Sequence, residues 1–201
     1  MSQTFHKLLN PNCLLAIDTT RRRVAFTEDS NKTTDTLQSI TMEDLPENSF
    51  VFCLDKEVPY RFKDKSLTQK PKNYFLNIAD SHINDIADGL IIHYVQNHIY
   101  VFIVEMKSLS KNGFGIQLIN TKLLIEYIFR LYQVFEKSGD TLQIQLVLFH
   151  YERPITKQKK GFGKEKRGFF TKKIIQGYSE TYISCPLYEP MGFIHWNEFF
   201  Q

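Results

Sequence analysis

The strongest constraint on the fold is an apolar ribbon at residues 87–108, which reads ADGLIIHYVQNHIYVFIVEMKS. Val, Ile, Tyr and Phe dominate the ribbon, which favours β-strands. The polar pair at 96–97 favours a tight turn between two of them. Charged side chains stand only at the tips, with Asp88 at one end and Glu105 and Lys107 at the other. The ribbon therefore predicts a β-hairpin whose two charged ends meet.

The register of this hairpin depends on which residues form the turn. A turn at 96–97 pairs Asp88 with Glu105, whereas a turn at 97–98 sets Asp88 opposite Lys107. Both registers put the three charges on one face, because Glu105 and Lys107 are two residues apart on a strand. A three-residue turn would break this arrangement. The sequence favours two carboxylates and an ammonium converging at one end of an apolar sheet.

Charges beside apolar neighbours such as Ile92 and Ile103 are costly to bury unless something binds them. Two carboxylates at strand ends suit Mg²⁺, with Mn²⁺ as a substitute, because the ion keeps further positions for water and a phosphate oxygen. Lys107 could then orient or deprotonate an attacking water and stabilise charge developing on phosphate. The alternative is a cross-strand salt bridge, which is worth little by itself.

A helix is expected at about 114–137, where apolar residues keep a 3–4 spacing and Ser138-Gly139 supplies a stop. Its predicted apolar face consists of Ile116, Ile119, Leu123, Tyr127, Leu131 and Phe135. Strands are expected at 13–28 (two short strands around a turn), 48–55, 142–151 and 181–187. Residues 29–48 predict a loop or a poorly anchored helix, and 56–73 predict a loop. This order makes the chain α/β with a mixed sheet, and its length suits a single domain.

The residues IADGLI…VFIVEMKS resemble the D-x(n)-E-x-K core of the PD-(D/E)xK nuclease superfamily. That superfamily includes restriction endonucleases, repair and recombination exonucleases and phage-defence nucleases. In it, the aspartate opens one strand, E-x-K closes the antiparallel neighbour and a helix follows, which is the order expected here over about 75–150. The resemblance implies a restriction-endonuclease-like mixed β-sheet flanked by helices. It also implies that Asp88 and Glu105 are metal ligands and that Lys107 is the catalytic lysine.

Further positions follow from the same resemblance. Many members carry a glutamine on the following helix, which implies a catalytic role for Gln117, although Thr121 stands where they have a tyrosine. Ala87 replaces the proline that names the superfamily. Many members also add a carboxylate from an upstream helix. The candidates for that carboxylate are Glu43, Glu47, Asp80 and Asp85.

A basic segment at about 153–173 holds nine Lys or Arg against one acid, Glu165. Glycines and aromatics interleave with these cations, so the segment predicts either a solvated loop or an arm that contacts phosphates and stacks on bases. The nucleic-acid contacts expected from it are Lys157, Lys159, Lys160, Lys164, Lys166, Arg167, Lys172 and Lys173. A second cluster, at residues 21–23, stands in an expected turn and could assist.

Composition narrows the class of protein. Net charge is only +3, so binding of nucleic acid has to come from local patches. No window reaches the roughly 18 apolar residues that span a bilayer, and the N-terminus lacks the pattern of a signal peptide. The three cysteines are far apart without a CxxC pair, which argues against structural zinc and disulfides. No Walker A motif or G-x-S-x-G elbow occurs. We expect a cytoplasmic protein without a membrane segment.

The leading hypothesis is a Mg²⁺-dependent nuclease that hydrolyses DNA phosphodiester bonds over one domain, residues 1–201. The resemblance implies an effector of restriction or phage defence. Little of the chain remains for sequence recognition, so we expect a homodimer or a partner protein subunit. One alternative is a non-catalytic nucleic-acid-binding or assembly module that keeps the fold and pairs its three charges internally. Another is an RNA-directed nuclease.

Overall fold

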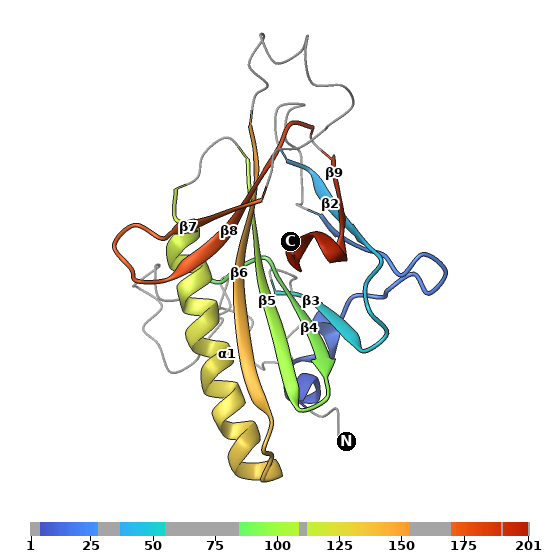
Figure 1. Cartoon of the computed structure of the whole chain (residues 1–201), viewed down its shortest axis with the longest axis vertical. Coiled ribbons are helices and arrows are strands. Elements are labelled where there is room, and N and C mark those ends of the chain that lie inside the picture. The colour runs from blue at the N-terminus through green and yellow to red at the C-terminus, as the bar shows by residue number, and fades with distance from the viewer. Residues whose placement is uncertain are drawn as a thin grey trace, which may run out of the picture.

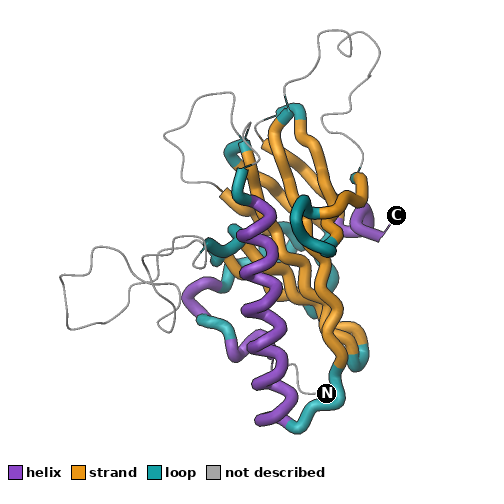
Figure 2. The backbone as a smooth tube through the Cα atoms, turned by 90° about the vertical axis from the view of Figure 1, so that its left-hand side faces the viewer, coloured by secondary structure: helices purple, strands orange, loops and turns teal. Residues whose placement is uncertain are grey.

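Figure 1 shows a computed structural model of the chain. The structure describes residues 5–27, 37–54, 85–108, 112–152, 170–189 and 191–200. A large twisted sheet stands in the centre, a long helix covers one of its faces, and a small second sheet packs on the other (Figures 1 and 2). The expected mixed α/β architecture is confirmed. The described residues contain one α-helix, so a small sheet covers the face where a second helical layer was expected.

The large sheet has six strands in the order β3-β4-β5-β6-β8-β7. They are β3 (Ser49–Cys53), β4 (Gly89–Val95), β5 (His98–Lys107), β6 (Thr141–Tyr151), β7 (Thr171–Ile174) and β8 (Thr181–Leu187). The strands β3, β4 and β5 form an antiparallel meander, β5, β6 and β8 run parallel, and β7 closes the edge antiparallel to β8. Helix α1 (Phe114–Glu136) makes the crossover that the parallel pair β5–β6 requires.

The small sheet has the order β1-β2-β9, with β1 at Val24–Thr27, β2 at Ser39–Glu43 and β9 at Met191–His195. The prediction of a loop or helix over 29–48 is wrong at β2, where Ile40 and Met42 are fully buried in strand alternation. The partner of β2 is β9, about 150 residues later in the chain, so local composition could not reveal the pairing. Of the two strands expected in 13–28, only β1 forms. The 3₁₀ helices are Phe5–Leu8, Pro11–Cys13 and Trp196–Phe200.

The two faces of the large sheet bury two separate clusters. On β5, Phe102, Val104 and Met106 pack with the small sheet, whereas Val101 and Ile103 pack with α1. This continuous burial is what the apolar ribbon predicted. The first residue of β4, Gly89, lies under Phe26 of β1, whose Cε1 atom would be 2.1 Å from an added Cβ. Only glycine fits there, and the small sheet thereby packs directly over the start of β4.

The expected bounds of α1 are confirmed, but its predicted buried face is wrong. The residues that face the sheet are Leu118, Thr121, Ile125, Phe129 and Tyr132. Three residues of the predicted face are exposed instead, with exposed fractions of 58% for Leu123, 62% for Tyr127 and 77% for Phe135. The helix is apolar on most sides, so its periodicity could not decide which side meets the sheet.

The expected strands at 48–55, 142–151 and 181–187 are confirmed as β3, β6 and β8. The predicted loop at 56–73 lies outside the described residues, and so does most of the basic segment. The end of that segment is a strand, because Lys172 and Lys173 belong to β7. No helix in the described part of the chain has the length and apolar character needed to cross a bilayer.

Candidate functional site

The hairpin adopts the first of the two expected registers. Val95 pairs with His98, so the turn is at 96–97, where Gln96 takes a positive φ of 52°. The ladder runs back to the pair Gly89 and Val104, and one further step sets Asp88 opposite Glu105. The register with a turn at 97–98 and the three-residue turn are both excluded.

Glu105 is fully buried on the side of the sheet that α1 covers. The Nζ atom of Lys107 lies 2.6 Å from its Oε1 atom. Apart from this ion pair and a contact with the Asp88 amide, the Glu105 carboxylate has no hydrogen-bond partner among the described residues. The pKa of Glu105 rises to about 8, first because of burial and then because of the nearby Asp88 carboxylate, while Lys107 opposes the rise. Glu105 is therefore a buried carboxylate that is poorly stabilised in its charged form.

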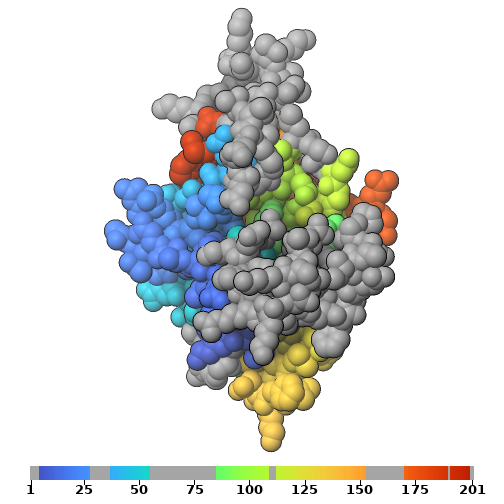
Figure 3. Space-filling view, turned by 180° about the vertical axis from the view of Figure 1, so that it is seen from behind, coloured from blue at the N-terminus to red at the C-terminus, as the bar shows by residue number. Residues whose placement is uncertain are grey.

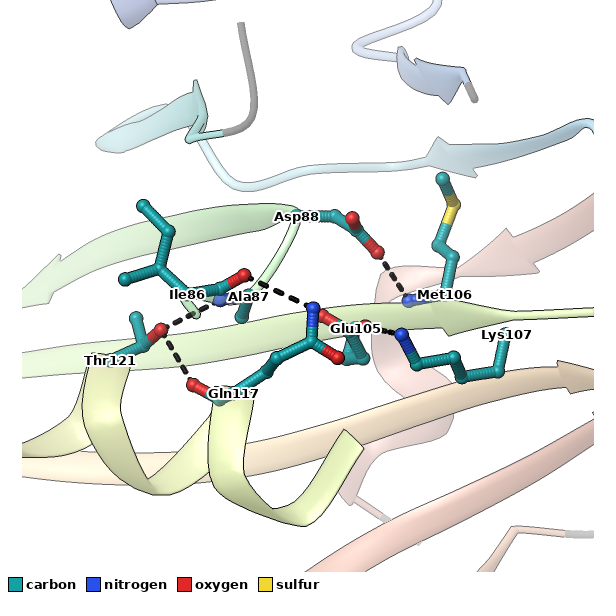
Figure 4. Close-up of polar contacts among 8 residues, drawn as sticks. All are labelled: Ile86, Ala87, Asp88, Glu105, Met106, Lys107, Gln117 and Thr121. Atoms are coloured by element: carbon teal, nitrogen blue, oxygen red, sulfur yellow. Dashed lines mark hydrogen bonds and ion pairs between the residues drawn. The ribbon is translucent and has the colours of Figure 1, made fainter. Parts of the chain in front are cut away.

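Asp88 is held by both of its neighbouring strands. Its Oδ2 atom accepts a hydrogen bond of 2.6 Å from the Met106 amide of β5, and its carbonyl accepts one of 2.8 Å from Leu54, just after β3. The carboxylate thus continues the β4–β5 ladder one step beyond the last backbone pair. Figure 4 shows Asp88, Glu105 and Lys107 together at the end of the hairpin.

Three side chains of α1 hold the segment that leads into Asp88, and Figure 4 shows two of them, Gln117 and Thr121. The contacts are Gln117 Nε2 to the Ile86 carbonyl (3.4 Å), Asn120 Nδ2 to the Asp85 carbonyl (3.0 Å) and the Ala87 amide to Thr121 Oγ1 (2.8 Å). The Thr121 hydroxyl also donates to the Gln117 carbonyl at 2.8 Å. Thr121 is fully buried and was noted in the sequence only as a departure from a family pattern. Gln117 lies at the site as expected, where its amide positions the backbone before β4.

The upstream carboxylates do not complete a larger cluster. Asp85 precedes the site and Glu43 lies on β2, beside His195 of β9. Glu47 is exposed and forms an ion pair with Arg22 at 3.6 Å, and Asp80 lies outside the described residues. Within the described ranges, no group of three or more His, Cys, Asp or Glu side chains could hold a metal ion. The acidic part of the site is the pair Asp88 and Glu105.

The described residues of the basic segment and of the second cluster do not contact the acidic pair. Lys172 and Lys173 are exposed on β7, three strands away from β5, which corresponds to about 14 Å. The other expected contacts, Lys157, Lys159, Lys160, Lys164, Lys166 and Arg167, lie outside the described residues. Of the second cluster, Arg23 is paired with Asp18 at 3.1 Å and the Arg22 guanidinium donates to the Leu45 carbonyl. Arg23 thus stabilises its own turn, and Arg22 ties that turn to the segment after β2.

His150 lies beside Lys107 in the β5–β6 ladder, a position that the sequence did not indicate. Its Nε2 atom is 3.0 Å from the hydroxyl of Ser184 on β8, and its Nδ1 atom is 3.4 Å from Glu152. His150 and Ser184 are both 1% exposed. Together with Glu105 and Lys107 they form a polar row across three parallel strands. In the sequence, His150 is a polar residue near the end of the apolar run 142–151, and this was the signal that could have pointed to it.

Comparison of the chain with protein-family models, curated proteins and solved structures gives no match. The geometry at the end of the hairpin therefore has to carry the functional argument.

The raised pKa of Glu105 predicts a loss of stability as pH rises. The folded state keeps its proton up to a pH of about 8, whereas the unfolded chain releases it near 4.5. Glu105 therefore contributes its full stabilisation below pH 4.5. This contribution to the free energy of unfolding, on the order of a few kcal/mol, is lost as the pH rises from 4.5 to 8. In EDTA, Glu105→Gln should raise the melting temperature at pH 8 and leave it nearly unchanged near pH 4.5. The exposed Glu47→Gln is the control, and parallel melting curves for wild type and Glu105→Gln across this range would contradict the prediction.

The Thr121 hydroxyl predicts a second stability effect. Thr121→Val leaves the Ala87 amide without its acceptor in a buried position, so we expect a loss of about 1–3 kcal/mol in the free energy of unfolding. Thr121→Ser keeps both hydrogen bonds and should cost less. Urea unfolding of the two variants measures the difference. A serine variant as unstable as the valine variant would show that the hydroxyl has no role.

Proposed function

We propose that the chain is a Mg²⁺-dependent nuclease that hydrolyses DNA phosphodiester bonds, with a restriction-endonuclease-like fold of the PD-(D/E)xK type. The observation that carries the proposal is the fully buried Glu105 carboxylate, whose pKa is raised by burial and by the nearby Asp88 carboxylate. Asp88 lies beside it and Lys107 contacts it at 2.6 Å. A strand opened by the aspartate, a strand closed by E-x-K and a helix that follows also support it.

The donor set fits a hard divalent cation. Two carboxylates on adjacent strands repel each other, and burial raises the cost of that repulsion, so a cation between them would remove an existing penalty. Asp88 and Glu105 would hold the ion, with its other positions left for water and phosphate oxygens. When bound, Mg²⁺ or Mn²⁺ would supply Lewis-acid polarisation of the phosphate.

The protein's own residues supply the remaining parts of the site. Lys107 has a side chain that is 21% exposed, so solvent reaches it beside the buried carboxylate. There it can orient a water by hydrogen bonding and stabilise negative charge on a phosphate. Gln117 and Thr121 hold the backbone before Asp88 and so fix the distance between the two carboxylates. Lys172, Lys173 and the basic residues before them would bind the DNA backbone electrostatically.

A second candidate function is a nucleic-acid-binding module without catalysis. The ion pair between Lys107 and Glu105 favours it, because the charges then neutralise each other and need no metal. In that case the basic residues alone would bind the nucleic acid, and no bond would be cleaved. For the nuclease, we infer from the resemblance a cytoplasmic effector of restriction or phage defence that acts on DNA.

Cleavage assays separate the two functions. Supercoiled plasmid, labelled single-stranded DNA and RNA are incubated with Mg²⁺, Mn²⁺ or EDTA. We expect metal-dependent cleavage of DNA that falls by about 10²–10³ in Lys107→Ala, because a charge at the reacting phosphate is lost. Lys7→Ala, an exposed lysine in the first 3₁₀ helix, is the matched control and should retain full activity.

Other results would change the conclusion. Cleavage of RNA but not of DNA would show that the chain is an RNA-directed nuclease. DNA binding without cleavage, unchanged by Lys107→Ala, would contradict the nuclease and support the binding module. Equal cleavage by wild type and Lys107→Ala would remove the lysine from the mechanism.

A further inference from the structure

A buried polar network at the end of β6 has no part in the chemistry described so far. The Nε2 atom of His150 lies 3.0 Å from the Ser184 hydroxyl, and its Nδ1 atom lies 3.4 Å from the Glu152 carboxylate. His150 and Ser184 are each 1% exposed. A buried imidazole is costly unless polar groups meet its nitrogens, and here an oxygen stands near each of them. The network therefore holds the ring of His150 in one orientation.

The strand register puts this ring beside Lys107. The two residues pair across the parallel strands β5 and β6, which are neighbours in the sheet (Figure 1). Neighbouring strands lie about 4.8 Å apart. Both side chains point to the face that α1 covers, because Ile103 and Leu148, an even number of residues before them, pack in the cluster on that face. The imidazole is thus the direct neighbour of Lys107 on β6.

Lys107 is the flexible member of the candidate site. Its ammonium lies 2.6 Å from Glu105, and its side chain is 21% exposed. The four-carbon stem of a lysine gives up rotamer freedom when the ammonium is held in one place. A ring that is fixed beside the stem excludes alternative rotamers in advance, so that less freedom is lost when the ion pair forms.

We propose that His150 is a positioning residue for Lys107. Ser184 and Glu152 hold the imidazole, the imidazole restricts the lysine stem, and the ammonium is thereby kept against Glu105. At 1% exposure the ring does not reach a substrate, so it acts through the lysine. The catalytic consequence rests on the proposed nuclease, in which the network would keep the ammonium where it meets the attacking water and the phosphate.

The sheet contains a matched control for this network. The Ser49 hydroxyl lies 3.3 Å from Nδ1 of His93, and Ser49 is 6% exposed. This second serine–histidine pair is far from the site, because His93 lies five residues beyond Asp88, or about 17 Å along β4. In the space-filling view of Figure 3, the cyan segment that leads into β3 lies on the other side of this face from the yellow-green start of α1. Ser49→Ala therefore removes a bond of the same kind without touching the lysine.

The ¹H–¹⁵N signal of the Lys107 ammonium tests the proposal without any need for activity. It is recorded on the full chain labelled with ¹⁵N-lysine and assigned by its absence in Lys107→Arg. We expect the ion pair with Glu105 to slow exchange of the ammonium protons in the wild type. Ser184→Ala should broaden or abolish the signal, although Ser184 on β8 is two strands from Lys107, or about 10 Å. Ser49→Ala should leave the signal unchanged.

A second variant removes the ring itself. His150→Gln keeps a hydrogen-bonding group for the Ser184 hydroxyl but leaves nothing rigid beside the lysine stem, so it should also abolish the signal. Ser184→Thr keeps the hydroxyl and should retain the signal. Absence of the Lys107 signal from the wild type, or an equal signal in the wild type and Ser184→Ala, would overturn the proposal.

Cleavage kinetics test the catalytic consequence. Ser184→Ala should lower kcat by about tenfold, leave KM within about twofold, and cause no further loss in the Lys107→Ala background. Equal falls in both backgrounds would show that the network acts on the fold and not through the lysine, and would overturn the proposal. If the wild type cleaves no nucleic acid, the proposed function fails, while the ammonium signal still decides whether His150 positions Lys107.

Discussion

The candidate site depends on one constraint, the burial of the Glu105 carboxylate beside Asp88 and Lys107. A buried carboxylate beside a second carboxylate costs free energy that the ion pair with Lys107 only partly offsets, and the pKa of Glu105 rises to about 8. An arrangement that only stabilised the fold would place an apolar residue at this position. The site retains two mutually repelling acids and one ammonium, and the proposed metal site rests on this arrangement.

Helix α1 gives this site its geometry. As the crossover between β5 and β6 it makes those strands parallel, and their register brings His150 beside Lys107. Its inward residues Thr121 and Gln117 hold the backbone that leads into Asp88. On the other face of the sheet, Phe26 packs on Gly89, so the residue after Asp88 cannot carry a side chain. The carboxylate pair is thus fixed from both faces.

Local sequence was sufficient where the determining contacts are local. Either of the two possible two-residue turns placed Asp88, Glu105 and Lys107 on one face by counting, and the structure selects the turn at 96–97. It was insufficient where a distant partner decides. The strand β2 forms because it pairs with β9, and Thr121 matters because the Ala87 amide lies beside it. The buried side of α1 could not be predicted either, since both sides of the helix are apolar and packing selects one.

Binding of Mn²⁺ to the metal-free protein, followed by the electron paramagnetic resonance signal of the free ion, tests the central claim most directly. The account predicts one bound Mn²⁺ per chain in the wild type and loss of that site in both Asp88→Asn and Glu105→Gln. Glu47→Gln, which changes an exposed acid in an ion pair with Arg22, should bind as the wild type does. Absence of binding in the wild type, or equal binding in all three variants, would show that the buried carboxylates are not a cation site.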